Sequence, residues 1–170
     1  MPVNAVSAVV SVGAPEHFDD VYRGHYRRVV AAMRLTGLSL DDAEDVTQEA
    51  FAKAFGGWGR VVLGTNPDGY VYRSAFRLSA RRRRVTGREE PLTVTETADL
   101  SSAGELTDAL AIRTAVSALP RRQRDCVLMC LLAGFTSTEA GRILHIRPSA
   151  VRVHVMTGRQ TLQRVLGPTS

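Results

Sequence analysis

The chain has 170 residues, with 22 lysines and arginines against 17 acids and a formal net charge of +5. This length fits one domain or two small ones, and the basic balance favours a polyanionic partner. No stretch reaches the roughly 18 consecutive apolar residues of a membrane-spanning helix, and the first 15 residues lack the basic start of a signal peptide. We therefore expect a cytoplasmic protein without membrane insertion, in which residues 1–15 form a flexible tail.

Two helices are predicted first. Apolar residues recur at helical spacing from about residue 16 to residue 35, and Gly37 then predicts a stop. Asp41 and Asp42 favour the start of a second helix, because acids are stabilised in a first turn, and this helix runs to about Phe55.

The second helix has an acidic outer face. Residues 41–49 contain five acids and no basic residue. Ala43, Val46 and Ala50 share the predicted inner face, which leaves an outer face of Asp45, Gln48 and Glu49. Such a face is poorly suited to DNA and suits a basic protein partner, although a merely solvated acidic face is the ordinary alternative.

A third helix is predicted from Pro67 to about Val85, after a loop over residues 60–65. Asn66 provides a helix cap and Pro67 fits the first helical position. From Arg60 to Arg88 there are eight arginines against one acid, a net charge of +7.

Arginines and aromatic residues mix on this third helix. If Val71, Ala75 and Leu78 form its buried stripe, arginines project from the opposite side and aromatic residues lie among them. Aromatic rings stack on unpaired bases while guanidinium groups hold phosphates, which suits melted DNA. Alternatively, the aromatic residues belong to the core and the arginines form a solvated helix end. The residues concerned are Arg73, Arg77, Arg81, Arg84, Tyr70, Tyr72 and Phe76.

Residues 87–104 are rich in acids, threonine and serine and have no helical period, which predicts a flexible linker. Four helices are predicted after it, over residues 106–118, 120–133, 136–144 and 148–166. From Pro120 to Ser170 the net charge is +6, so an acidic linker separates two basic blocks. The predicted fold class is all-α: two small helical domains joined by a flexible linker, with a helix-turn-helix in the C-terminal domain.

The last two helices form the helix-turn-helix, and Pro148 begins the second of them. A helix with one apolar side and a polar side that carries arginine can lie in a DNA major groove. The predicted inner side is Val151, Val155, Gly158, Leu162, Val165 and Leu166. The predicted outer side is Ser149, Arg152, Met156, Arg159 and Gln160.

No catalytic or metal site is expected. The four histidines are scattered along the chain, and Cys126 and Cys130 lie four residues apart on an apolar helix, which favours buried free thiols. We expect no cofactor, no metal and no enzymatic activity.

Four motifs in order resemble an extracytoplasmic-function (ECF) sigma factor of bacterial RNA polymerase. They are the acidic stretch from Asp42 to Phe55, the stretch from Asn66 to Arg73, the arginine cluster after it, and Ala118 to Arg124 followed by the helix-turn-helix. The resemblance covers about residues 16–167. It implies a region 2-like domain over residues 16–86, the linker, and a region 4-like domain over residues 105–170.

The resemblance also implies functional sites and partners. Region 2 would bind the clamp of the largest polymerase subunit and melt the −10 element, with a flipped base held by the loop over residues 57–66. Region 4 would bind the −35 element and the flap of the second-largest subunit, and an anti-sigma factor is a further candidate partner. The implied polymerase-binding residues are Asp45, Gln48 and Glu49. The implied −10 residues are Trp58, Arg60, Tyr70, Arg73, Arg77, Arg81 and Arg84. The implied −35 residues are Arg147, Ser149, Arg152, Val153, His154 and Arg159.

The chain departs from the family pattern at four positions. Tyr70 stands where Trp is frequent, and Arg77 stands where many members have an Asn that helps to read the −10 strand. His145 replaces a glycine in the turn, with modest strain if that residue needs a positive φ, and Thr157 replaces a basic residue.

Two alternatives remain at this point. A helix-turn-helix regulator that acts without polymerase would give Asp45, Gln48 and Glu49 no role. A degenerate sigma-like interaction protein would bind polymerase or a regulator without recognising a promoter, and His145 and Thr157 are its best support.

Overall fold

The computed structural model describes residues 17–64, 66–86 and 103–167, and all regular structure within these ranges is helical. This confirms the all-α prediction. The tail predicted over residues 1–15 lies outside the described residues, as do residues 87–102 of the linker predicted over residues 87–104. The domain boundaries stay a prediction, although helix α5 already begins at Ala103.

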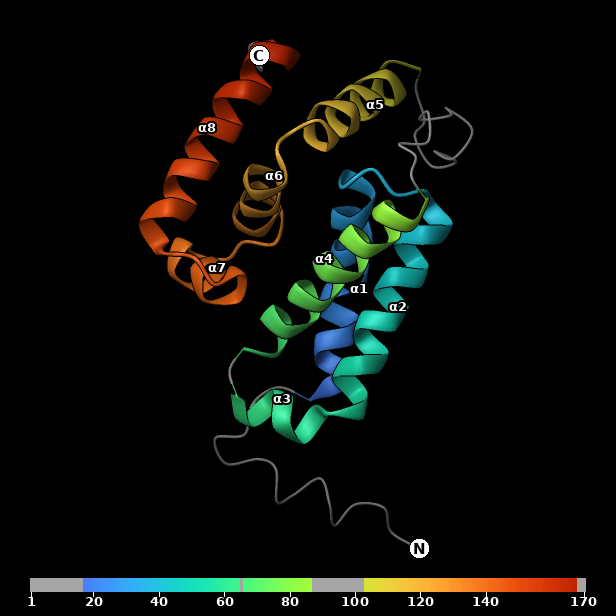
Figure 1. The fold of residues 1–170 in the computed structure, drawn as a ribbon. Coiled ribbons are helices and arrows are strands. Elements are labelled where there is room, and N and C mark those ends of the chain that lie inside the picture. The colour runs from blue at the N-terminus through green and yellow to red at the C-terminus, as the bar shows by residue number, and fades with distance from the viewer. Residues whose placement is uncertain (1–16, 65, 87–102, 168–170) are drawn as a thin grey trace, which may run out of the picture.

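The first unit packs three long helices around one core (Figure 1). These helices are α1 (Phe18–Leu35), α2 (Leu40–Gly56) and α4 (Pro67–Thr86). Val29, Met33, Phe51 and Tyr72 are buried between them, and each fully buried side chain of this size contributes about 1.5–3 kcal/mol.

The end of α1 is fixed as the sequence predicts. Gly37 has a φ of +102°, in the left-handed region that glycine adopts without strain. Beside it, the buried hydroxyl of Thr36 donates to the Met33 carbonyl at 2.6 Å and lies 2.7 Å from the Ser79 hydroxyl of α4. The turn after α1 is therefore tied to the third long helix.

The second unit places its last helix across two shorter ones (Figure 1). α8 (Pro148–Leu166) packs on α6 (Arg121–Val127) and α7 (Ser137–Leu144), and α5 (Ala103–Ser117) also contacts it. A π-helical turn, η3 (Leu128–Leu132), continues α6, where the sequence predicts one uninterrupted helix. No helix in the described ranges is long and apolar enough to cross a membrane.

The two units are packed against each other, which the sequence does not predict. α7 contacts α4, and α5 contacts α1 (Figure 1).

Candidate nucleic-acid and polymerase interfaces

The outer face of α2 is acidic and accessible. Ser39 caps the helix by accepting a hydrogen bond from the backbone NH of Asp42 at 3.1 Å, which fixes where the helix begins. Ala43, Val46 and Ala50 are buried, as predicted. The predicted polymerase-binding residues Asp45, Gln48 and Glu49 are all exposed.

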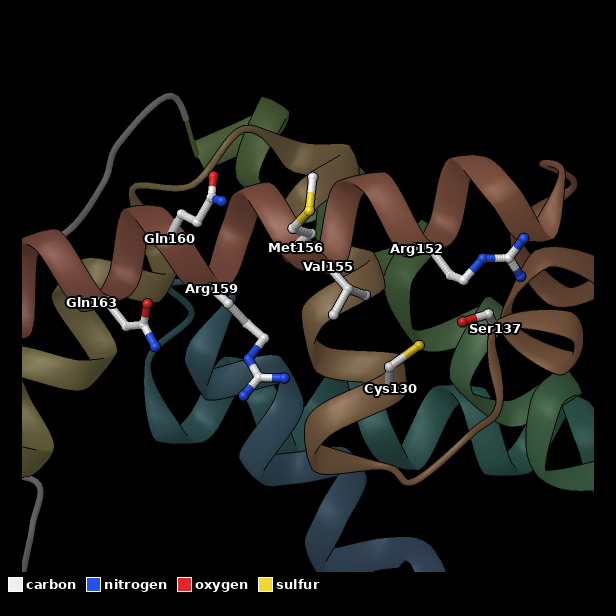
Figure 2. A pocket seen from close by; sticks show the side chains of 8 residues that line it. All are labelled: Cys130, Ser137, Arg152, Val155, Met156, Arg159, Gln160 and Gln163. Atoms are coloured by element: carbon white, nitrogen blue, oxygen red, sulfur yellow. The ribbon is translucent and has the colours of Figure 1, made fainter.

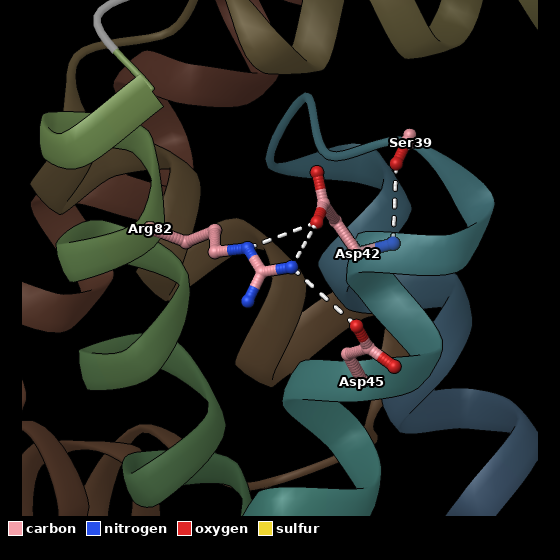
Figure 3. A network of polar contacts seen from close by, with 4 residues as sticks. All are labelled: Ser39, Asp42, Asp45 and Arg82. Atoms are coloured by element: carbon pink, nitrogen blue, oxygen red, sulfur yellow. Dashed lines mark hydrogen bonds and ion pairs between the residues drawn. The ribbon is translucent and has the colours of Figure 1, made fainter.

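Part of this acidic face is engaged within the protein (Figure 3). Arg82 of α4 donates to the Asp42 carboxylate through both Nε, at 2.9 Å, and Nη2, at 2.5 Å. The same Nη2 lies 3.4 Å from Asp45 Oδ2, and hydrogen bonding to Asp42, followed by its negative charge, raises the pKa of Arg82. Glu49 pairs with Lys53 at 2.9 Å. Since the side chain of Asp45 is still 63% exposed, it remains available to a partner.

The basic face of α4 is largely as predicted. Val71 and Ala75 are buried and Leu78 is half-buried, so the opposite side faces outward. Of the predicted −10 residues on this helix, Arg77, Arg81 and Arg84 are exposed, Tyr70 is 39% exposed and Arg73 is half-buried. Arg82 points away from this face toward α2.

Tyr72 and Phe76 do not belong to this face, so of the two alternatives that the sequence leaves open for these aromatic residues, the core is the correct one. Tyr72 is fully buried and Phe76 is 5% exposed. Burial raises the pKa of the Tyr72 hydroxyl to about 12, and its ring packs edge-on against His25 at 6.0 Å and Phe135 at 5.4 Å. α4 is covered on two sides, by α1 and α2 and by α7, which widens its buried stripe beyond the predicted one.

The loop predicted over residues 60–65 is wrong, because most of this segment is a short helix, α3 (Trp58–Gly64). Trp58 is half-buried, with its ring edge-on to Phe18 at a centroid distance of 5.2 Å. Arg60, the next predicted −10 residue, is exposed. A base pocket at this position would have to form along a helix instead of an irregular loop.

The helix-turn-helix has the local geometry of its motif. Thr136 and Glu139 form a capping box at the start of α7, and the Thr136 hydroxyl accepts from the Glu139 NH at 3.2 Å. Hydrogen bonds from Thr136 hold the pKa of Glu139 below its usual value. His145 ends α7 at φ 56° and ψ 44°, which is the left-handed conformation, and Pro148 occupies the first turn of α8. The positive φ anticipated at His145 is therefore present.

The outer side of α8 carries exposed polar and basic residues, among them Ser149, Arg152 and Arg159, together with two apolar side chains, Val153 and Met156, each 54% exposed. Val151 and Gly158 are buried beneath it, and Val155 and Leu162 are half-buried. The buried side of α8 ends at Leu162. Val165 is 64% exposed and Leu166 is 39% exposed, so their predicted inward position is wrong. Of the predicted −35 residues, His154 is half-buried, and the exposed ones are Arg147, Ser149, Arg152, Val153 and Arg159.

A shallow groove of about 400 Å³ runs beside α8 (Figure 2). Arg152 and Arg159 extend from α8 on the side where Cys130 and Ser137 lie. The first turn of α7 and the arginines of α8 thus share one surface, as phosphate and base contacts of a helix-turn-helix require.

The two cysteines lie on the continuous helical stretch formed by α6 and η3. Cys126 is buried, Cys130 is half-buried, both are free, and desolvation raises the pKa of the Cys126 thiol to about 12. A thiol in that environment is inert. No group of three potential metal ligands occurs within the described ranges.

Two helical units, of which the second presents a helix-turn-helix, define a DNA-binding transcription protein. Family resemblance narrows this class of protein: residues 21–89 match sigma-70 region 2, and residues 109–162 match sigma-70 region 4. The chain belongs to the sigma-70 family of RNA polymerase sigma factors, in its extracytoplasmic-function branch. Members of this family are initiation factors and not enzymes.

Relatives agree with this assignment. The ECF sigma factor SigM of Mycobacterium tuberculosis is 28% identical over 153 residues, which are 88% of this chain and 77% of SigM. SigE of Mycolicibacterium smegmatis is 29% identical over 166 residues, 90% of this chain and 63% of SigE.

Two solved structures share the fold. CnrH in complex with the cytosolic domain of CnrY aligns with a TM-score of 0.66 at 17% identity, over 90% of this chain and 89% of that one. The sigma factor RpoE in complex with the anti-sigma factor NepR from Bartonella quintana aligns with a TM-score of 0.71 at 19% identity, over 90% of this chain and 98% of that one.

Proposed function

We propose that this chain directs core RNA polymerase to its promoters through three separate surfaces: α2 binds the polymerase clamp, α4 binds the melted −10 element, and α8 reads the −35 element as duplex. The observation that carries the assignment is the distribution of charge on exposed faces. The face of α2 that points away from the core is acidic, and those of α4 and α8 are basic. A plain DNA-binding regulator needs only the last of these surfaces.

The proposed DNA surfaces of α8 and α4 differ in side-chain chemistry, as binding to duplex DNA and to melted DNA requires. α8 exposes Ser149 and Arg152 near its start, small and basic side chains that fit a major groove. α4 presents a row of arginines, with Tyr70 at its first turn, and this combination holds phosphates and stacks on an unpaired base. We assign phosphate contacts to Arg77, Arg81 and Arg84, and base reading in the −35 element to Ser149 and Arg152.

His145 weakens the alternative of a degenerate sigma-like protein. It adopts the left-handed conformation that the turn requires, so replacement of the usual glycine leaves the motif intact. Thr157 is half-buried on α8 and supplies no charge, so its replacement of a basic residue reduces the attraction to phosphate without changing the helix.

As a polymerase subunit, the protein would act in the cytoplasm. We also propose an anti-sigma factor as its regulator, binding both units and competing with core polymerase. Both structural neighbours were solved as complexes with a second protein, and one of those proteins is an anti-sigma factor. Co-purification from the native host, followed by competition with core enzyme, tests this: a partner that binds one unit and leaves polymerase binding intact contradicts it.

The function is tested by reconstitution. RNA 5′ ends mapped after overexpression give candidate promoters, and run-off transcription on those templates with purified core and this chain should yield transcripts that start at the mapped ends. Core alone should not yield them. A chain that shifts promoter DNA without core, and adds no transcript with core, would be a plain helix-turn-helix regulator. A chain that binds core but supports no specific start would be the degenerate protein.

A further inference from the structure

A cavity lies between the two units, where α7 contacts α4 (Figure 1). Its volume is about 490 Å³, which is within the range of small-molecule sites in proteins. Both units supply polar side chains to its walls: Asn66, Tyr70 and Arg73 from the first unit, and Glu139, Arg142 and His145 from the second.

The cavity is closed on the side where the two helices touch. Gly69 of α4 and Ile143 of α7 both line it, and a Cβ atom built on Gly69 would lie 2.7 Å from Cδ1 of Ile143. The two residues are therefore in close contact, which leaves no passage between the helices at this point. A recess that is closed in this way suits a small ligand better than a polymer that has to pass through it.

The polar walls of the cavity favour an anion. They contain two arginines, Arg73 and Arg142, against one acid, Glu139. Within the described ranges neither guanidinium lies in an ion pair or donates a hydrogen bond. The Glu139 carboxylate is engaged in the cap of α7, where its Oε2 atom accepts from the NH of Thr136 at 2.8 Å and from its hydroxyl at 2.9 Å. Two guanidinium groups on opposite walls suit a phosphate, because each offers several donors in a fixed plane.

Tyr70 supplies an aromatic surface beside this charge. Its side chain is 39% exposed, and among the described residues its ring contacts no other aromatic ring, whereas that of Tyr72 is buried. A nucleobase stacks on a ring of this kind. The Oδ1 atom of Asn66 accepts from the backbone NH of Asp68 at 3.1 Å, so the amide nitrogen of Asn66 remains a donor for the edge of a base.

We propose that this cavity is a binding site for a mononucleotide, with the phosphate between Arg73 and Arg142 and the base stacked on Tyr70. The site needs both units, because each contributes one of the two guanidinium groups. It does not rest on the proposed role of Tyr70 and Arg73 in −10 binding, since neither DNA nor polymerase takes part in it. The involvement of Arg142 separates the two, because the proposed −10 surface contains residues of the first unit alone.

Calorimetric titration of the full chain with guanosine 5′-monophosphate (GMP) tests the site. We expect a dissociation constant below about 1 mM. Guanosine lacks the phosphate and ribose 5-phosphate lacks the base, so each should bind at least ten-fold more weakly than GMP. No binding of GMP in this range overturns the proposal, and so does either fragment that binds as tightly as GMP.

Substitutions in both units locate the nucleotide. Tyr70→Leu, Arg73→Ala and Arg142→Ala should each weaken GMP binding at least ten-fold in protein of native helicity. The matched controls are Arg23→Ala on α1 and Arg164→Ala on α8, which remove one exposed arginine from each unit away from the cavity and should leave the affinity unchanged. Unchanged affinity in Arg142→Ala would mean that the first unit alone binds the nucleotide, and it would overturn the two-unit site.

Photolabelling provides a second measurement that requires no substitution. An azide derivative of GMP should label peptides from the start of α4 and from α7, and excess GMP should prevent the labelling. Labelling of one unit alone, or labelling that GMP does not reduce, overturns the proposal. Failure of the chain in run-off transcription counts against the proposed function and leaves both binding measurements valid, so the two failures are distinguishable.

Discussion

Arg82 of α4 donates hydrogen bonds to Asp42 of α2 through two nitrogen atoms. Asp42 lies in the first turn of α2, and Arg82 lies near the end of α4. This ion pair joins the acidic face of α2 to the helix that carries the basic face. The pair keeps one arginine of the cluster out of the proposed DNA surface and reduces the net negative charge near Asp45.

Arg82→Ala should therefore lower the free energy of unfolding. Because Arg82 is 41% exposed and Asp42 29%, solvent screens the pair, and we expect a loss of about 0.5–1 kcal/mol. Urea denaturation followed by circular dichroism measures it. Arg81→Ala removes the same charge from an exposed position one residue earlier and should leave the stability nearly unchanged. Equal losses for the two variants would show that the ion pair contributes nothing.

Asp45→Arg combined with Glu49→Arg should abolish binding to core polymerase. Both side chains are exposed and point away from the buried Ala43, Val46 and Ala50, so the fold should persist. A reversed charge would face a basic partner with repulsion. A pull-down with purified core measures the effect, with helicity checked by circular dichroism.

The matched control is Asp19→Arg with Asp20→Arg, which makes the same change of charge at exposed positions on α1. It should retain core binding. If the α2 variant binds core as tightly as the unmodified chain, or if both variants lose binding alike, then α2 is not the specific contact.

His145→Gly should leave stability and −35 binding within about 1 kcal/mol of the original values. Glycine relieves the cost of a left-handed φ of 56° but loses more entropy on folding, and the two effects oppose each other. His145→Val should cost about 1–2 kcal/mol, because a branched side chain fits this region poorly. Thermal unfolding and a gel-shift assay on −35 duplex provide both readouts.

Thr138→Val is the control for the valine substitution, since Thr138 is exposed in the regular part of α7. It should change neither readout appreciably. A tolerated valine at position 145 would mean that the turn does not need the left-handed residue that the structure contains.

Arg152→Ala should weaken binding to −35 duplex by about 1–3 kcal/mol and relax the preference at one base pair if the guanidinium reads a guanine. If it contacts phosphate alone, binding to all sequences should weaken alike and the salt slope should fall by about one. Fluorescence anisotropy at several salt concentrations separates the two. Arg164→Ala, also exposed on α8 but near its end, serves as the charge-matched control. Parent-like affinity of Arg152→Ala at every salt concentration would exclude both roles.

The sequence predicts the parts of this molecule that depend on local chemistry. Four local features each follow from one residue and its immediate neighbours. They are the Asn66 cap of α4, the stop at Gly37, the proline that begins α8, and the left-handed residue His145. The outward direction of Asp45, Arg77 and Arg152 follows from helical period alone.

The parts that the sequence misses depend on distant contacts. For Tyr72 and Phe76 the sequence leaves an exposed face and the core equally open, and the contact of α7 with α4 decides for the core. Trp58 begins a helix in a segment with two glycines because its ring packs on Phe18, 40 residues earlier in the chain. Nothing in the sequence explains glycine at position 69, where a Cβ atom would lie only 2.7 Å from Cδ1 of Ile143 in α7.

The central claim is that α4 and α8 bind two different promoter elements while α2 holds the polymerase, and position-specific crosslinking tests it most directly. A photoreactive amino acid at position 77 or 152 of the chain, assembled with core on a mapped promoter, should crosslink to different DNA. Position 77 should crosslink to the −10 element, and more strongly when that element is pre-melted; position 152 should crosslink to duplex at the −35 element. Crosslinks of both positions to the same element, or from position 77 to intact duplex alone, would contradict this account.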